Sequence, residues 1–508
     1  MSELGDEMPS DQLLTKNIGE EFVCVGQWWL PTGPDPLNPE HKCGGTLSFV
    51  RSGDGIKLEI MGQLQAEELQ EKLVGRAIEM IWGISTEGEL ITLLNCHSAE
   101  MTMGAVWTES FIVGQVFVSK SAWFTPDEPL AFASLAIQYT HLADWVDVSG
   151  FRRPKPDEYN RFIVEKKAEI YFERPPDIPP IFVKNNAISI RFGNSWPSIR
   201  PAMQEAHIKQ YTWIFVEPGN SEEITLDEAL IFVRGIQNFL TLVMYDNAIY
   251  PIVIEGQVKT EEKTSEKTPH ATMRLLYEPI ATKPPSKSIL RHNILFTYEE
   301  VADFWERALN KLIPLDGDQL KSVLNNFFAE YFSPSAYAED RLMATIRTME
   351  VFHRRTTEKA CYISKEKYDK TLLKRFTEQI DELERLGEID ADFQRSLKKR
   401  LSCGYSYSLE KRLNNLFTSY GKSFLTSFVA EGQTDFIRKI VATRNWLTHY
   451  DEEEKGGALE SGPELAFLNL KLQLFVVVLL LSYAGFPPEK IQDKLKHHQF
   501  DYLRVKAT

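Results

Sequence analysis

The chain has 508 residues, a length that predicts about two to four domains. Hydrophobic residues make up 43% of it and charged residues 25%, so the composition is that of a globular protein and excludes disordered, collagenous and fibrous chains. Acidic residues outnumber basic ones by 72 to 57. The resulting net charge of −15 argues against a protein that coats nucleic acid nonspecifically, although it does not exclude a local basic site.

The cysteines and the apolar segments indicate where the protein resides. Five scattered cysteines without a CxxC pattern encode neither a disulfide framework nor a cysteine-built zinc site, which fits a reducing cytoplasm. The N-terminal segment MSELGDEMPSDQLLTKN lacks the basic and apolar regions of a secretory signal. The most apolar stretch, residues 474–481, is far shorter than the ~20 residues that cross a bilayer. We therefore expect a cytoplasmic protein without a membrane partner, in which this stretch is a core helix or a helix at a subunit interface.

A β-rich domain, sandwich-like or barrel-like, is expected over residues 20–255, after a flexible N-terminus of residues 1–19. Short alternating runs of apolar and polar residues, rich in β-branched and aromatic side chains, are separated there by turn residues. A helix is expected over residues 226–240, where Thr225 begins a capping sequence. The expected strands include residues 45–50, 56–61, 90–94, 111–118, 169–172, 187–192 and 211–216.

Residues 256–292 contain a polar, charged segment and a Pro pair, and they are expected to be a linker. From residue 293 to 508 the apolar period becomes helical, which predicts an all-α bundle and gives the whole chain an α+β multidomain class. The expected helices cover residues 298–312, 317–331, 336–355, 365–386, 390–401, 408–420, 434–448 and 463–483, with a short one after Pro488.

Charge is distributed unequally along the chain. Residues 336–450 contain 21 Lys and Arg against 16 Asp and Glu, whereas the remainder is strongly acidic. The densest basic clusters are residues 353–355 and 398–400. Such a region has the electrostatic footprint that a polyanion needs, although a solvated helix face is the simpler interpretation of any single cluster.

Several chemistries lack the residues they need. The sequence contains no phosphate-binding loop, dinucleotide fingerprint, HExxH, GxSxG or EF-hand motif. The pairs His41/Cys43 and Cys96/His97 match no recurrent zinc spacing, and we interpret them as ordinary strand and turn residues. No metal and no cofactor is implied.

The most informative segment is IRKIVATRNWLTHYDEEE, residues 437–454, which places Arg444, Asn445 and His449 at the end of a helix. An imidazole is suited to move a proton near neutral pH, and a guanidinium is suited to hold a phosphoryl oxygen. At ~100° per residue, Asn445 and His449 are about 40° apart but Arg444 and His449 are about 140° apart. Either the helix ends or bends before His449, or a second copy of the motif completes the site in a dimer.

This segment resembles the R-x4–6-H signature, with Asn after the Arg, of HEPN domains, which are helical ribonuclease modules of prokaryotic defence and toxin systems. The helical segment AEDRLMATIRTMEVFHRR and the N-terminal segments 26–31 and 44–47 are similar to the anti-phage ApeA family, in which a β-rich domain precedes the HEPN domain. The resemblance covers residues 20–255 and 295–505.

The resemblance implies metal-independent RNA cleavage by a homodimer, or a higher homo-oligomer, whose motifs meet at the interface. It implies that His449 is a general base or acid, that Arg444 stabilises the phosphorane and that Asn445 orients His449 or the phosphate. The expected substrate is tRNA or other host RNA, with abortive infection as the outcome. A phage protein is the expected trigger or inhibitor, and the β-rich domain is expected to sense it or to restrain the nuclease.

Alternatives remain open at this point. The helical domain is alternatively a non-catalytic module that binds RNA, a nucleotide or a protein. Arg444 and His449 alternatively interact only with the acidic run after the helix and with its last carbonyls. For Glu350 and His353 we favour a packing and solvent role, and for Trp28 and Trp29 a place in the core or at its edge.

Overall fold

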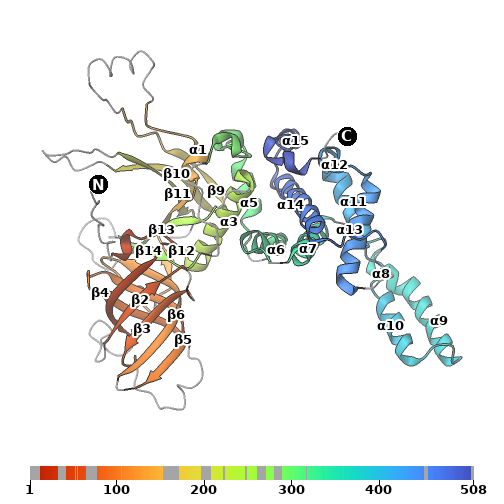
Figure 1. Ribbon diagram of the computed structural model, residues 1–508, viewed down its shortest axis with the longest axis horizontal. Coiled ribbons are helices and arrows are strands. Elements are labelled where there is room, and N and C mark those ends of the chain that lie inside the picture. The colour runs from red at the N-terminus through yellow and green to blue at the C-terminus, as the bar shows by residue number, and fades with distance from the viewer. Residues whose placement is uncertain are drawn as a thin grey trace. The chain divides into compact units, whose positions relative to one another are not determined.

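The protein consists of two compact units, Met1–Ile313 and Pro314–Thr508, which are described separately. The first is rich in strands and the second is helical, so the predicted α+β multidomain class is confirmed (Figure 1). The computed structural model describes residues 12–31, 42–51, 53, 55–64, 77–104, 106–152, 171–195, 208–220, 223–245, 249–259, 270–279, 289–315, 317–335, 337–358, 360–450 and 456–504.

Six antiparallel strands close a barrel in the first unit. The hydrogen-bonded order is β3-β2-β1-β4-β5-β6, and a further pairing of β3 with β6 completes the ring. Buried and exposed side chains alternate along β3, as expected for a strand with one face in a core. The barrel-like alternative of the prediction is therefore correct. The strands are β1 (Phe22–Trp29), β2 (Cys43–Phe49), β3 (Ile56–Met61), β4 (Ala77–Ser85), β5 (Leu90–Met103) and β6 (Trp107–Ser119).

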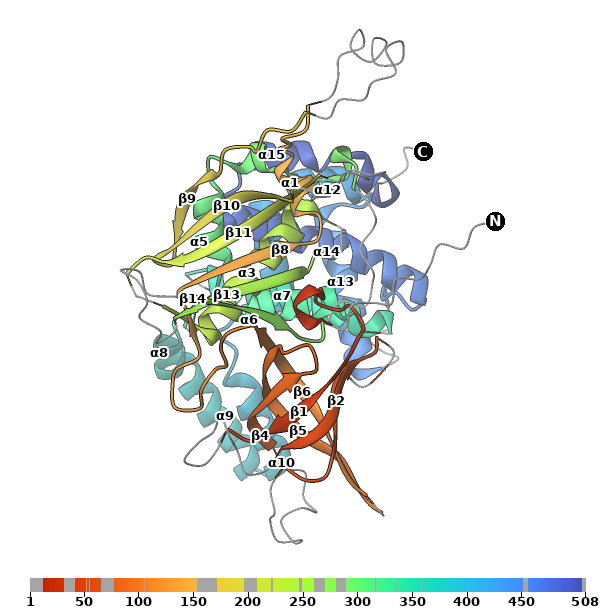
Figure 2. The same cartoon turned by 90° about the vertical axis from the view of Figure 1, so that its left-hand side faces the viewer.

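The last residues of β6 pair with β5 of the barrel on one side and with β14 on the other, so that the sheet continues through six more strands. Figure 2 shows these strands side by side next to the barrel. The helix α3 (Leu226–Met244) begins at the predicted Thr225 capping box, and the Tyr139 hydroxyl donates a hydrogen bond of 2.7 Å to its Val233 carbonyl. The order is β14 (His270–Leu276), β13 (Pro251–Lys259), β8 (Ser134–Tyr139), β11 (Lys209–Pro218), β10 (Asn186–Ser195) and β9 (Ile178–Val183).

Short elements complete this unit. A two-stranded ribbon pairs β7 (Ala131–Phe132) with β12 (Ile224–Thr225), and a 3-10 helix lies at Leu13–Thr15. The remaining helices are α1 (Leu142–Val146), a 3-10 helix at Arg291–Asn293, α4 (Tyr298–Val301) and α5 (Trp305–Leu312).

The core of the barrel confirms the prediction for the paired tryptophans. Trp28 and Trp29 are both fully buried. A Cβ at Gly83 would lie 2.3 Å from the Trp28 ring, so only glycine fits where β4 passes this side chain. The two indoles are therefore core residues and not surfaces on which a base could stack.

Two of the expected boundaries are wrong. The expected linker, residues 256–292, contains β14 and the end of β13, because both strands pair with distant strands of the sheet. The expected flexible N-terminus is packed from residue 12, since the buried Glu89 carboxylate accepts hydrogen bonds from the Leu13 and Leu14 backbone N–H groups. Residues 1–11, 260–269 and 280–288 lie outside the described residues, as do the first two residues of the expected strand 169–172. Phe172 forms an isolated bridge with Phe151.

The second unit is a bundle of helices. The predicted apolar stripe on α7, formed by Leu342, Ile346, Met349 and Phe352, is buried as expected. The helices are α6 (Lys321–Phe332), α7 (Ala338–Thr356), α8 (Lys365–Tyr368), α9 (Lys374–Arg385), α10 (Ala391–Leu401), α11 (Leu409–Tyr420), α12 (Lys422–Phe428), α13 (Gln433–His449), α14 (Gly462–Ala484), α15 (Pro488–Lys494) and a final 3-10 helix (His498–Leu503).

The apolar helix α14 lies in the core of this bundle. Among the described residues it alone is long and apolar enough to cross a membrane, and two-thirds of its most apolar stretch is buried inside the protein. It packs along α7, where the Thr345 hydroxyl donates a hydrogen bond of 2.7 Å to Asn469 Oδ1. This packing is that of the core helix predicted for residues 474–481.

Candidate functional site

The predicted motif lies on α13, which is held in the bundle by one apolar face. Its buried residues recur at helical spacing and consist of Phe436, Ile437, Ile440, Thr443 and Leu447. The helix ends when Tyr450 adopts a left-handed conformation, with φ of 53° and ψ of 34°, and its N–H bonds to the Trp446 carbonyl at 2.7 Å. The motif therefore occupies the last two turns of the helix.

The structure brings together two of the three predicted site residues. Arg444 Nη1 donates a hydrogen bond of 3.2 Å to Asn445 Oδ1, and both side chains are half-buried. His449 is exposed, and within the described residues no hydrogen bond or ion pair joins it to either of the others. This arrangement leaves the imidazole of His449 open to solvent and to any ligand.

Because α13 continues through His449, the alternative in which the helix ends or bends before this residue is wrong. Arg444 and His449 are five residues apart on one uninterrupted helix, and at ~100° per residue they point about 140° apart. The acidic run 451–454, which was expected to allow the bend, lies outside the described residues. The uninterrupted helix therefore excludes the first of the two alternatives, an end or a bend before His449.

Polar contacts fix both ends of α13. At its start, Gln433 Nε2 donates hydrogen bonds of 2.8 Å to Asn414 Oδ1 and 3.1 Å to Thr418 Oγ1 on α11. Near the motif, the Leu459 N–H donates to the buried Thr443 hydroxyl at 3.0 Å. This bond ties the helix turn that carries Arg444 to the segment preceding α14, so the position of Arg444 depends on the fold of the whole bundle.

An ion pair secures the loop before α13. Lys439 binds Glu431, and Lys471 Nζ on α14 donates to the Phe428 carbonyl at 2.6 Å. Partial burial acts to raise the pKa of Glu431, but the hydrogen bond and charge of Lys439, together with the charge of Lys471, outweigh burial and lower it. The carboxylate therefore stays ionised.

Comparison with known families supplies the context for this helix. Residues 23–312 match the family described as ApeA N-terminal domain 1, and residues 343–490 match the Apea-like HEPN family. The chain belongs to the ApeA family. No curated protein and no solved structure matches the chain. The HEPN match includes α13 and its three motif residues, and the N-terminal match ends next to the boundary between the two units.

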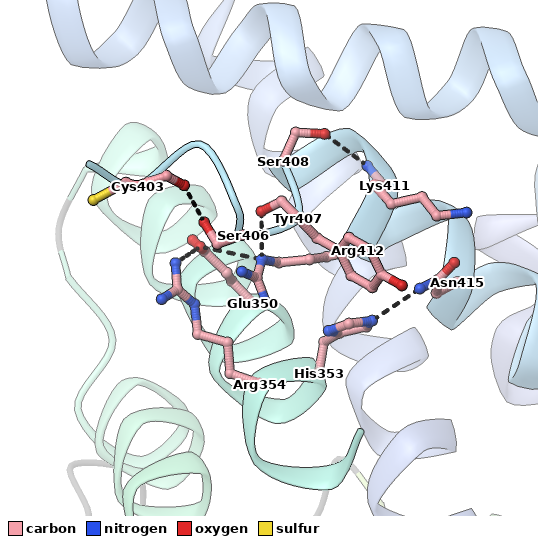
Figure 3. A network of polar contacts seen from close by, with 10 residues as sticks. All are labelled: Glu350, His353, Arg354, Cys403, Ser406, Tyr407, Ser408, Lys411, Arg412 and Asn415. Atoms are coloured by element: carbon pink, nitrogen blue, oxygen red, sulfur yellow. Dashed lines mark hydrogen bonds and ion pairs between the residues drawn. The ribbon is translucent and has the colours of Figure 1, made fainter. Parts of the chain in front are cut away.

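A second polar cluster in the HEPN domain lies between α7 and α11 (Figure 3). The buried Arg412 donates through Nε to the Tyr407 carbonyl at 3.1 Å and lies 3.9 Å from Glu350 Oε1. Arg354 donates to the same carboxylate oxygen at 2.6 Å. Asn415 Nδ2 donates to His353 Nε2 at 3.2 Å. The cluster joins the end of α7 to the start of α11.

The packing role predicted for Glu350 and His353 is confirmed for His353, which is only 1% exposed. Burial, reinforced by the positive charges of Arg412 and Arg354, lowers the pKa of His353 to about 4. The imidazole is therefore neutral at physiological pH and structural in this ApeA-family chain.

Sequence reasoning missed Arg412. It shares a helix face with Leu409 and Leu416, which lie three residues before it and four residues after it. A charged residue at a position where the helical pattern places an apolar one was the signal that could have indicated its burial. In the described part of the chain, no three His, Cys, Asp or Glu side chains are grouped as metal ligands would be. His41 of the considered zinc pairs lies outside the described residues.

Proposed function

We propose that this ApeA-family chain is an anti-phage endoribonuclease that cleaves RNA with Arg444, Asn445 and His449. The observation that carries the proposal is the coincidence of a complete RNxxxH motif with the HEPN match, on a helix that exposes the histidine. Family membership supports the nuclease and defence themes, and the exposure of His449 gives RNA access to the reactive imidazole.

The chemistry suits RNA because its 2′-hydroxyl is an internal nucleophile that DNA lacks. His449 accepts the 2′-hydroxyl proton, or donates a proton to the departing 5′-oxygen. A bond forms between the 2′-oxygen and phosphorus while the bond from phosphorus to the 5′-oxygen breaks. Arg444 stabilises the charge that builds on the phosphorane, and Asn445 holds the Arg444 side chain in place. The products are a 2′,3′-cyclic phosphate and a 5′-hydroxyl, and a water molecule makes whichever of the two proton transfers His449 does not make.

The proposed active form is a homodimer with a composite site, because one α13 directs Arg444 and His449 to different sides. A second copy supplies a histidine opposite the arginine of the first. Exposed apolar side chains on the first half of α14 support an interface there, since Phe467 is 41% exposed and Leu470 38% exposed. The segment that leads into α14 is tied to α13 through Thr443.

In the cell, we propose tRNA or other host RNA as the substrate in the cytoplasm and abortive infection as the outcome. The proposed trigger or inhibitor is a phage protein, and the β-rich unit is proposed to sense it or to restrain the nuclease. The support for this assignment is the match of both units to one anti-phage family.

The test is an RNA cleavage assay in EDTA with purified wild-type protein, His449→Ala and a matched control, His498→Ala. His498 is an exposed histidine elsewhere in the same unit. We expect wild type and the control to produce fragments with 2′,3′-cyclic phosphate ends, and His449→Ala to lose at least about 100-fold in rate. Extract from infected cells is added in a parallel reaction to supply the trigger.

A wild-type protein that stays inactive even with infected-cell extract would contradict the nuclease assignment. Protection against phage that persists in both Arg444→Ala and His449→Ala cells, together with measurable RNA binding, would favour the alternative of a non-catalytic binding module.

A further inference from the structure

A helical hairpin in the second unit carries a charge pattern that the proposed catalytic residues do not explain. It runs from α8 through a π-helical turn (Asp369–Leu373) into α9 and returns as α10. The antiparallel pairing is fixed by Tyr368, whose hydroxyl donates to the Leu401 carbonyl at 2.7 Å, and by Gln394 Nε2, which donates to Asp381 Oδ1 at 2.7 Å. Figure 1 shows α9 and α10 extending from the other helices of this unit.

The hairpin buries very little. Within residues 365–401, only Tyr368 and Ile380 are buried, so nearly all of its side chains face solvent. A hairpin with so small a core of its own exposes most of its surface to solvent. We name residues 362–376 and 398–400 the hairpin base, and residues 377–397 the hairpin tip.

Charge is strongly segregated between these two parts. The hairpin base contains eight Lys and Arg and only two carboxylates, Glu366 and Asp369. The hairpin tip contains seven Asp and Glu and two arginines. In a chain whose net charge is −15, the base is therefore a concentrated positive patch next to a negative one.

The cations of the base are mostly unpaired, whereas those of the tip are paired. Both tip arginines bind neighbouring carboxylates, Arg385 with Glu382 and Arg395 with Asp392. In the base, Lys370 binds Glu366 and Lys398 binds Asp381. The other six are exposed and have no carboxylate within ion-pair distance among the described residues. They are Lys365, Lys367, Lys374, Arg375, Lys399 and Arg400.

Exposed aromatic rings accompany these cations. Phe376, which directly follows Arg375, is 44% exposed, and Tyr362 before α8 is 60% exposed. Cations that contact a phosphate backbone, combined with aromatic faces on which bases stack, are the common way in which proteins bind single-stranded nucleic acid. The π-helical turn lies inside the base, and such turns occur frequently at functional sites.

We propose that the hairpin base is a docking surface for single-stranded or loop RNA, which holds the substrate by its phosphates while the hairpin tip repels the backbone. The inference rests on the proposed function only in taking RNA as the substrate. The aromatic side chains favour RNA over an acidic protein, because a carboxylate-rich partner has no planar bases to stack on Phe376 and Tyr362.

The test measures RNA binding separately from cleavage, in His449→Ala protein. Lys399→Gln/Arg400→Gln in the base is compared with Arg385→Gln/Arg395→Gln in the tip, which removes the same charge from the same hairpin. The probe is a fluorescein-labelled single-stranded RNA of mixed sequence, titrated by fluorescence anisotropy at several salt concentrations. A quadruple variant adds Lys374→Gln and Arg375→Gln.

We expect the base double variant to bind about 10-fold more weakly and to lower the slope of log affinity against log salt by about 0.7 per cation removed, with a larger loss in the quadruple variant. The tip variant is expected to bind as tightly as the parent. Circular dichroism verifies that each variant retains its helices.

Unchanged RNA affinity in the base variants would overturn the proposal, as would an equal loss in the tip variant. A parallel titration uses polyglutamate as an acidic protein probe. If the base variants lose affinity for polyglutamate but keep their affinity for RNA, the proposal is overturned in favour of an acidic protein partner. The two proposals fail separately: a wild-type protein that cleaves no RNA but binds it through the base contradicts only the nuclease assignment, and cleavage without dependence on the base contradicts only the docking surface.

Discussion

His353 shows how a residue with apparent catalytic potential becomes structural through burial. Its Nε2 accepts a hydrogen bond from Asn415, while its Nδ1 has no hydrogen-bond partner among the described residues. The nearby Arg412 is equally buried and its charge disfavours protonation of the imidazole. A neutral imidazole therefore belongs to the folded state of the helical unit, and protonation opposes that state.

This burial predicts a loss of stability in acid. The pKa of His353 is lowered to about 4 in the folded protein, from its ordinary value of 6.5, so between these pH values the unfolded chain binds a proton that the folded chain excludes. Stability is therefore complete above pH 6.5 and decreases as the pH falls toward 4. The contribution amounts to about 2 kcal/mol at pH 5 relative to pH 7.

The measurement is urea unfolding of the full chain, followed by circular dichroism at pH 7 and at pH 5, for wild type and His353→Gln. Glutamine does not titrate and retains a group that can accept the hydrogen bond from Asn415. We expect the variant to lose about 2 kcal/mol less than wild type on acidification. An identical loss in both proteins would contradict the burial argument.

At the residue scale, the candidate site was predictable where its members are neighbours in sequence. Arg444, Asn445 and His449 share one helix, so their angular relation follows from helix geometry alone. The burial of Arg412 was not predictable in this way, because it depends on the Tyr407 carbonyl and on Glu350, which α7 brings from 62 residues away. Local sequence patterns do not indicate contacts between residues so far apart in the chain.

At the element scale, helical periodicity predicted most helices of the bundle within a few residues. Residues 365–386 were expected as one helix and are one continuous helical segment, but with a π-helical turn that periodicity does not reveal. The helix α12 was not predicted. Gly421, a residue typical of helix ends, indicated that the helical region stopped there, whereas in the structure it ends α11 and begins α12 with no intervening loop.

The exposed apolar side chains on α14 lead to a prediction about assembly. Phe467 and Leu470 lie three residues apart on one face, a spacing that suits packing against another helix. If this face forms the proposed dimer interface, Phe467→Asp/Leu470→Asp buries two charges without partners and shifts the protein to monomers. We expect RNA cleavage to fall with the dimer fraction.

Analytical ultracentrifugation measures the dimer fraction, and Leu386→Asp/Phe393→Asp is the matched control on the hairpin tip. Those two side chains are exposed to a similar or greater degree, so the control introduces the same charges at the same kind of position. A dimer that survives the α14 substitutions would place the interface elsewhere.

At the scale of the whole molecule, local patterns predicted that a strand-rich part precedes a helical part. They did not predict the residue at which the first part ends and the second begins. β13 pairs with β8 and β14 pairs with β6, so Ile254 lies opposite Ile137 and Met273 opposite Ser119. Pairings across more than 100 residues leave no periodic signal near the strands themselves. The charged segment between β13 and β14 therefore suggested a linker, and the boundary between the two units lies at Ile313 and Pro314.

A composite site makes a distinct prediction for the complete assembly. In a mixture of Arg444→Ala and His449→Ala subunits, each heterodimer contains one site with an intact Arg444 from one chain and an intact His449 from the other. Neither variant cleaves RNA alone, yet the mixture recovers up to roughly a quarter of wild-type activity, because half of the dimers are mixed and each has one working site of two.

The experiment mixes the two purified variants after transient dissociation in mild denaturant and measures RNA cleavage after exchange, with tagged subunits to verify that heterodimers form. The control mixture combines His449→Ala with the double variant Arg444→Ala/His449→Ala, which supplies no histidine and must remain inactive. Recovery only in the first mixture means that the two chains divide the site between them. If heterodimers form but RNA cleavage does not recover, the composite site with one Arg444 and one His449 is contradicted. Either the two residues then act from the same chain, or a single site needs Arg444 and His449 from both chains.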